Sequence, residues 1–125
     1  MPPTRVSVII VARPGLLRES LVTFLKATAE VGDVISVDDP ALVADRLHQD
    51  APRAIIIDAS LGQAAVAALL QRLRADAPAI RRIVLTDDAW PHERFLSAGA
   101  DEVLVKGFLG DRLRRAVLGD PVLPE

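Results

Sequence analysis

The sequence predicts an α/β fold: a doubly wound, five-stranded parallel sheet with helices on both faces. Short runs rich in valine and isoleucine alternate with helical patterns every ~20–25 residues, which is the spacing of repeated strand–helix units. These runs are almost continuously apolar, as expected for strands that helices cover on both faces. At 125 residues, the chain is also long enough to bury a core of its own without disulfides or metals.

The first half of the chain holds two predicted strands and two predicted helices. Residues 6–11 are the first strand. A helical stripe follows it at Leu17, Leu21, Phe24 and Thr28. Residues 34–37 are the second strand. Asp39 then precedes Pro40, which is the pattern of a helix cap with proline in the first turn, so a short helix is expected over residues 40–49.

The second half repeats this alternation. Residues 54–57, 83–85 and 103–105 are the remaining predicted strands. Two helical stripes accompany them, at Val66, Leu69, Leu70 and Leu73, and at Leu109, Leu113, Ala116 and Val117. Trp90 before Pro91 repeats the proline signal, so a second short helix is expected over residues 91–98.

Five strands that are each followed by a helix are most simply built with right-handed crossovers in the flavodoxin-like order 2-1-3-4-5. A dinucleotide-binding sheet is the weaker alternative, because the turn at residues 12–15 reads Ala-Arg-Pro-Gly and lacks the glycine-rich phosphate fingerprint. No repeat or linker interrupts the chain before two prolines near its end. We therefore expect one domain over residues 1–118 and a tail or truncated linker over residues 119–125.

The composition excludes several classes of protein. With 15 basic and 17 acidic side chains, the net charge of −2 argues against direct nucleic-acid binding. The absence of cysteine excludes disulfides, thiolate zinc sites and cysteine nucleophiles. The uncharged stretch at residues 59–71 is too short and too polar to span a membrane, and no signal peptide is recognisable. A cytoplasmic protein without membrane association is expected.

Polar residues at the ends of the predicted strands mark the candidate site. Arg13 follows the first strand, Asp58 the third, Thr86 the fourth and Lys106 the fifth. In a doubly wound sheet, ligands bind outside the carboxyl ends of the strands, near the point where strand order reverses. We therefore expect these side chains to converge on one edge of the sheet.

Nearly the whole chain resembles the CheY-like receiver domain of bacterial two-component response regulators, above all receivers fused to helix-turn-helix output domains. The residues that carry the resemblance are 16–21, 55–58, 83–86, 98–101 and 103–106. It implies that Asp58 is the phosphoacceptor of a histidine kinase and that Thr86 and Lys106 contact the phosphoryl oxygens. A carboxylate nucleophile, a hydroxyl donor and a cation suit this chemistry.

The family also carries an acidic pair after the first strand that binds Mg²⁺ together with the phosphoacceptor, and here Ala12 and Arg13 replace it. Because Mg²⁺ prefers oxygen ligands, we expect metal binding to be lost or very weak, and no cofactor. Asp87 and Asp88 are interpreted as loop carboxylates rather than substitute ligands. Two further departures lie beside Lys106. Leu104 or Val103 stands where the family usually has an aromatic residue, and Gly107 replaces the proline that commonly follows the lysine.

Arg13 is expected to pair with Asp58 and so to supply the positive charge that the metal has in ordinary receivers. The alternative is that Arg13 points into solvent at the start of the following loop. Without neighbouring acids, and with Arg13 and Lys106 close by, the pKa of Asp58 is expected to be lowered.

These departures favour an atypical receiver that acts as a phosphorylation-independent signalling and protein-interaction module and has no catalytic residues. We expect a protein partner, or self-association as a dimer, through the fourth and fifth helices. Trp90, Phe95 and Phe108 are candidate anchors there. Arginines on the last helix form either dimer salt bridges or a solvated face: Arg112, Arg114 and Arg115.

Two other functions stay open. Because Asp58, Thr86 and Lys106 are all retained, the chain is also compatible with a working phosphoacceptor in a histidine-kinase phosphorelay. A sensor of small anions, which would use Arg13 and Lys106 in the strand-end pocket, is the third reading. The resemblance is compatible with a transcriptional output domain, fused or separate.

Other catalysis is not expected. The segment at residues 58–60 reads Asp-Ala-Ser and lacks the second aspartate of aspartate-nucleophile hydrolases. His48 and His92 have neither triad partners nor metal-ligand spacing and are expected to be solvated.

Overall fold

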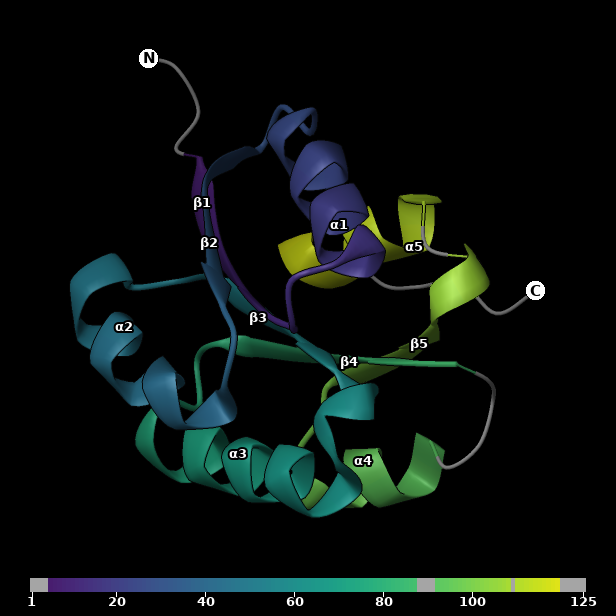
Figure 1. Cartoon of the computed structure of the whole chain (residues 1–125). Coiled ribbons are helices and arrows are strands. Elements are labelled where there is room, and N and C mark those ends of the chain that lie inside the picture. The colour runs from purple at the N-terminus through teal and green to yellow at the C-terminus, as the bar shows by residue number, and fades with distance from the viewer. Residues whose placement is uncertain (1–4, 88–91, 109, 120–125) are drawn as a thin grey trace.

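Five parallel strands form the centre of the structure, a computed structural model that describes residues 5–87, 92–108 and 110–119 (Figure 1). The strand order is β2-β1-β3-β4-β5, which confirms the predicted topology. The strands are β1 (Val6–Val11), β2 (Val31–Val37), β3 (Ala54–Asp58), β4 (Arg81–Thr86) and β5 (Glu102–Val105).

Two strands begin at least two residues earlier than the sequence predicted, and β5 begins one residue earlier, at Glu102. β2 starts at Val31 instead of residue 34, because Val31 already pairs with Val6, ahead of a register shift between Val6 and Val8. β4 starts at Arg81 instead of residue 83, and Arg81 pairs with Ala54. In both strands, glycine or charged residues lie near the amino-terminal end, so the apolar run used for the prediction begins later than the strand.

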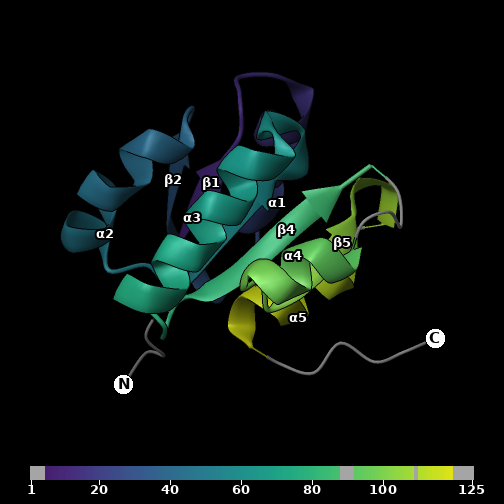
Figure 2. The same ribbon diagram turned by 90° about the horizontal axis from the view of Figure 1, so that it is seen from below.

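Helices cover both faces of the sheet, as predicted. They are α1 (Leu16–Lys26), α2 (Val43–Asp50), α3 (Gln63–Asp76), α4 (His92–Ala98) and α5 (Gly110–Leu118). Figures 1 and 2 show α1 and α5 on one face and α2, α3 and α4 on the other. None of the helices in the described ranges is long and apolar enough to cross a membrane.

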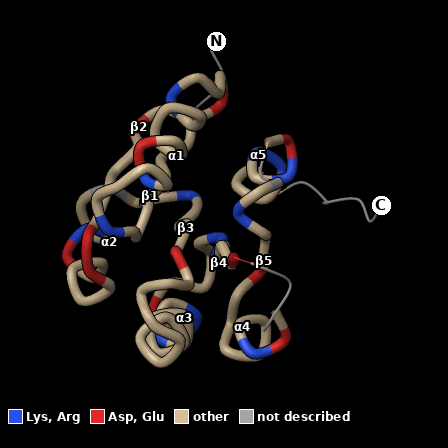
Figure 3. The backbone as a smooth tube through the Cα atoms, turned by 45° about the vertical axis from the view of Figure 1, so that its right-hand side comes forward, with Lys and Arg blue, Asp and Glu red and all other residues tan. Residues whose placement is uncertain are grey.

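Alternation along the strands divides the buried side chains between two cores. In β1, Ile9 and Val11 face α2, α3 and α4, whereas Val8 and Ile10 face α1 and α5. β3 and β4 alternate in the same way, since successive side chains of a strand point to opposite faces. Figure 3 shows the consequence: charged positions lie mainly on the helices and at the strand ends.

The predicted helix at residues 40–49 is a 3₁₀ turn, Pro40–Leu42, that leads into α2. Asp39 caps it, since its side chain accepts a hydrogen bond of 2.9 Å from the backbone N–H of Ala41. This confirms the cap that the sequence predicted.

The predicted helix at residues 91–98 is found as α4, and the last helix as α5. Several residues named in the sequence analysis lie outside the described ranges: Asp88, Trp90, Pro91, Leu109 and residues 120–125 of the expected tail.

Candidate functional site

The polar residues predicted to converge do lie at the carboxyl edge of neighbouring strands. Asp58 ends β3 and Thr86 ends β4, and Lys106 directly follows β5. Strand register brings them level, because Asp58 pairs with Leu85, the residue before Thr86, and Thr86 pairs with the residue before Lys106. Parallel pairing thus brings three distant parts of the sequence to one edge.

Asp58 is a buried carboxylate, only 8% exposed. Its Oδ1 lies 2.7 Å from Nζ of Lys106 and accepts a hydrogen bond of 2.9 Å from the backbone N–H of Ser60. Burial by itself would raise the pKa of Asp58, but the hydrogen bonds from Lys106 and Ser60 outweigh it and hold the pKa below its usual range. Asp58 is therefore ionised at neutral pH.

Lys106 has a second acidic neighbour, Asp87, which is the first residue after β4. Nζ of Lys106 lies 3.2 Å from Oδ1 of Asp87, whose side chain is 81% exposed. Burial alone would lower the pKa of Lys106, but its hydrogen bonds to Asp58 and Asp87 outweigh this and raise the pKa. The sequence marked Asp87 only as a loop carboxylate, and its contact with Lys106 is a new feature of the site.

Thr86 is buried at the end of β4, with 2% of its surface exposed. In the sheet, Thr86 pairs with Val105, the residue directly before Lys106. Val103 and Leu104 are the two residues that the sequence offered for the usual aromatic position, and both are buried in β5.

The end of β1 differs from the sequence-based expectation. Arg13 is exposed, and within the described part of the chain the ion pair of Asp58 is with Lys106, not with Arg13. The predicted Arg13–Asp58 pair is therefore wrong. Its physical reason is that Lys106 already supplies the neutralising charge to the buried carboxylate.

A different arginine approaches the end of β1. Arg18, on α1, donates a hydrogen bond of 3.3 Å to the carbonyl of Ala12 and forms an ion pair with Asp38. Ala12 itself is buried and completes the sheet, since its N–H donates to Val37 O at 3.1 Å. One feature of the sequence could have indicated this contact: Arg18 lies in the first turn of the helix that directly follows the end of β1.

The described residues contain no group of three or more His, Cys, Asp or Glu side chains that could hold a metal ion.

Of the three aromatic residues expected as anchors, Trp90 and the side chain of Phe108 lie outside what the structure describes. Phe95 of α4 is buried in the core, so it is not an exposed anchor. On α5, Arg114 forms an ion pair with Glu30, and Arg115 pairs with Asp111 at 2.7 Å. These contacts lie within one chain.

The two histidines also differ. His48 is exposed on α2, as expected, whereas His92 at the start of α4 is half-buried and its Nε2 is buried without a hydrogen-bond partner among the described residues. The expectation that both histidines are solvated is therefore wrong for His92.

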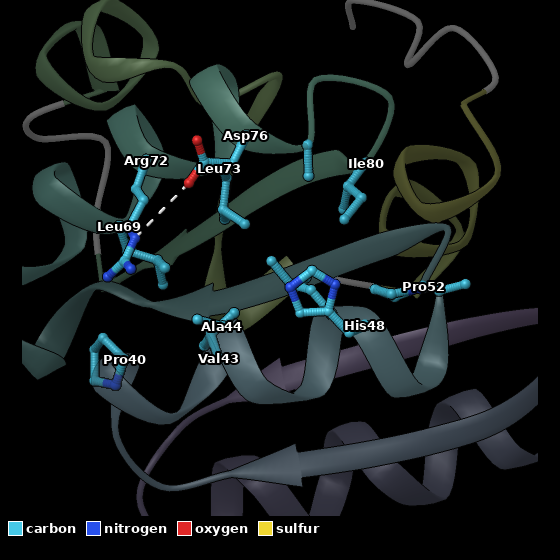
Figure 4. Close-up of a pocket in the computed structure, with 13 residues that line it drawn as sticks. Pro40, Val43, Ala44, His48, Pro52, Leu69, Arg72, Leu73, Asp76 and Ile80 are labelled. Carbon is cyan, nitrogen blue, oxygen red and sulfur yellow. Dashed lines mark ion pairs between the residues drawn. The ribbon is translucent and has the colours of Figure 1, made fainter.

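A separate cavity of about 470 Å³ lies between α2 and α3, away from Asp58 (Figure 4). Its walls are mainly apolar, with Val43, Leu69 and Leu73 among them, and His48 and Arg72 stand at its edge. The sequence analysis did not identify it, because the stripes that form it are typical of any buried helix face.

The fold and the arrangement at its carboxyl edge are those of a receiver-type signalling domain. Residues 8–118 match the family described as response regulator receiver domain, and the chain belongs to this family. It is thus a receiver domain of two-component signalling.

A curated relative is protein-glutamate methylesterase/protein-glutamine glutaminase 5 of Anaeromyxobacter dehalogenans (strain 2CP-C), which is 30% identical over 110 residues. The match covers 86% of this chain but spans only 30% of that protein.

Solved structures show the same fold. The signal receiver domain of NarL from Mycobacterium tuberculosis superposes with a TM-score of 0.82 at 23% identity, and covers 94% of this chain and 96% of that one. A DNA-binding response regulator of the LuxR family from Staphylococcus aureus gives 0.77 at 18% identity, with 91% and 97% covered.

Proposed function

We propose that this receiver domain signals through protein contacts, without magnesium-dependent phosphorylation of Asp58. The observation that carries the proposal is the identity of the two residues that follow β1, which bring a methyl group and a positive charge to the edge where Asp58 lies. Those residues are the buried Ala12 and the exposed Arg13, where the family has two acids.

The donor groups at this edge do not fit Mg²⁺. The ion takes an octahedral set of oxygen ligands, usually with one or two carboxylates. Ala12 offers a methyl group, and its carbonyl already accepts a hydrogen bond from Arg18. Arg13 brings a positive charge. The carboxylates that do lie there, Asp58 and Asp87, are both held against the ammonium of Lys106. Phosphoryl transfer through a bound Mg²⁺ is therefore no part of the proposed function.

Without that step, the exposed faces of the helices are the means of signalling. We assign the contact to α4 and α5, with a protein partner or a second copy of the chain as the occupant. Leu96, on α4, is a large apolar side chain that is 46% exposed, which supports a contact there. Dimer salt bridges by Arg114 and Arg115 would have to replace the pairs that these residues form within the chain.

The test is chemical phosphorylation. The wild-type chain is incubated with acetyl phosphate and MgCl₂, and separately with beryllofluoride, and is followed by intact-protein mass spectrometry and fluorine NMR. We expect no phosphoryl adduct and no bound beryllofluoride. An adduct that Asp58→Asn abolishes would refute the proposal.

A gain-of-function variant gives the matched control. Ala12→Asp with Arg13→Asp restores two carboxylates after β1, and we expect it to acquire Mg²⁺-dependent modification at Asp58. Because Ala12 is buried, Arg13→Asp alone is tested beside it, as its exposed site tolerates the change.

A working phosphoacceptor is the second candidate, favoured by the approach of Asp58 and Lys106 beside the buried Thr86. Histidine kinases are then the donors, and transfer of label from a phosphorylated kinase to Asp58, but not to Asp58→Asn, distinguishes it. An anion sensor is the third candidate, supported by the exposed Arg13 near this edge, and thermal stabilisation by candidate anions tests it.

A transcriptional output domain, fused or separate, is the partner that similarity to a DNA-binding response regulator suggests.

A further inference from the structure

Asp87 is placed to act on the candidate site although the family resemblance gives it no role. It directly follows Thr86 and begins the connection from β4 to α4. Its carboxylate lies 3.2 Å from Nζ of Lys106, on a side chain that is mostly exposed. The same ammonium lies 2.7 Å from the buried carboxylate of Asp58. One cation is therefore shared by two anions.

This sharing sets the charge of the site. Two carboxylates and one ammonium give Asp58, Asp87 and Lys106 together a formal charge of −1. An ammonium has three N–H donors, and these two carboxylates account for two of them. A further anion that approaches Lys106 would meet two carboxylates beside one ammonium whose donors are largely engaged.

We propose that Asp87 is a positioning residue that acts through Lys106: it is an internal anion that occupies the ammonium and weakens the binding of any external oxyanion. The inference deepens the proposed function and rests on it, because an occupied Lys106 is a second reason for Asp58 to remain unmodified.

The two carboxylates differ in how easily another anion replaces them. Asp58 is buried, and leaving its charge unpaired is costly. Asp87 is exposed, so water and salt compete for it, and an exposed pair contributes little to stability. An incoming oxyanion therefore displaces Asp87, not Asp58.

The lysine content of the chain makes the test direct, because Lys26 and Lys106 are its lysines. In protein labelled with [¹³C,¹⁵N]-lysine, the ammonium of Lys106 is followed by NMR during titration with inorganic phosphate. Three proteins are compared: wild type, Asp87→Asn, and Glu93→Gln. Glu93 is an exposed residue of α4 and is not one of the acidic partners of Lys106, so its variant makes the same change in net charge without removing a partner of the ammonium.

We expect Asp87→Asn to bind phosphate about two- to five-fold more tightly at Lys106, the factor that corresponds to the loss of one exposed ion pair. Glu93→Gln is expected to match the wild type. A pH titration gives a second readout: the pKa of Lys106 falls in Asp87→Asn, because one of the two carboxylates that raise it is removed. Circular dichroism confirms that the variants are folded.

Equal phosphate affinity in the wild type and Asp87→Asn, or an equal gain in Glu93→Gln, would overturn the inference. These outcomes are read on Lys106 in the absence of a phosphoryl donor. They are therefore distinct from the failure of the proposed function, which is an Asp58 adduct formed by the wild type with acetyl phosphate.

Discussion

The ammonium of Lys106 lies 2.7 Å from Oδ1 of Asp58, and the two residues come from the carboxyl ends of different strands. Both side chains are largely removed from solvent, so each is the main compensation for burying the other. This pair connects β3 to the end of β5 across the carboxyl edge. Its contribution to stability depends on the charge of Asp58 and hence on pH.

The first prediction concerns the loss of folding stability at low pH. The pKa of Asp58 is lower in the folded chain than in the unfolded chain, because Lys106 and Ser60 stabilise the carboxylate despite its burial. Between the two pKa values the unfolded chain binds more protons, so stability rises with pH there. The contribution of Asp58 is complete above about pH 4, the ordinary range of an aspartate, and is lost as pH falls through the folded value.

Urea unfolding of the wild type and Asp58→Asn from pH 7 to pH 2 measures this contribution. We expect the free-energy difference between them to be constant above about pH 4 and to shift against the wild type below it. Parallel profiles over the whole range would contradict the lowered pKa of Asp58.

The second prediction concerns Arg82, a buried cation that is 8% exposed. Its Nε donates to the carbonyl of Gly99 at 2.6 Å, and its guanidinium lies 3.6 Å from Asp101. Arg82→Met leaves these acceptors without their donor, and we expect a loss of about 3–5 kcal/mol. Arg72→Met is the control. Arg72 is exposed and forms a 3.9 Å pair with the exposed Asp76, so its change is expected to stay within about 0.5 kcal/mol. Similar losses in both variants would show that Arg82 is not the organising residue.

Arg82 also shows why part of the fold escaped the sequence. The apolar runs located all five strands because covered parallel strands need them. The start of β4 was missed because two arginines in succession are typical of a surface. Arg82 is buried with the nearby carbonyls of Pro78 and Ile80 and with Gly99 of the α4–β5 connection as acceptors. Gly99 is distant in the chain, so local hydropathy does not reveal this contact.

The candidate site was predictable to the same extent. Strand ends and the doubly wound topology brought Asp58, Thr86 and Lys106 to one edge. Whether Arg13 or Lys106 reaches Asp58 depends on side-chain torsions and on the path of the loop after β1, which residue spacing does not determine. The contact of Asp87 with Lys106 was missed for the same reason.

The third prediction separates steric from conformational cost at two glycines. Gly99 has φ +127°, and a Cβ built there would lie 3.2 Å from the carbonyl oxygen of Leu70. Gly62 has a similar φ of +118°, but nothing lies within 4 Å of its Cβ. In both alanine variants the positive φ strains the backbone, which costs about 1–3 kcal/mol of folding stability. Gly99→Ala must also push α3 away from the α4–β5 connection.

Thermal and urea unfolding of both variants tests this difference. We expect Gly99→Ala to be the less stable protein by about 1 kcal/mol or more, the usual cost of overpacking. Equal stability would mean that α3 and the turn at Gly99 separate freely.

The last prediction is a stabilising change. Ala51 ends α2 with φ 42° and ψ 58°, a left-handed conformation in which its Cβ approaches the following carbonyl. Glycine has no Cβ, so Ala51→Gly relieves this strain, although glycine also adds freedom to the unfolded chain. The strain of a left-handed alanine is about 1–2 kcal/mol and exceeds the entropic cost of glycine, so we expect a net gain of about 0.5–1 kcal/mol.

Ala67→Gly, in the middle of α3, is the matched control and is expected to lose about 1 kcal/mol, since helical alanine is unstrained. Opposite signs for these two substitutions in urea unfolding would support the left-handed cap. A loss of stability in both would mean that Ala51 adopts an ordinary helical conformation in solution.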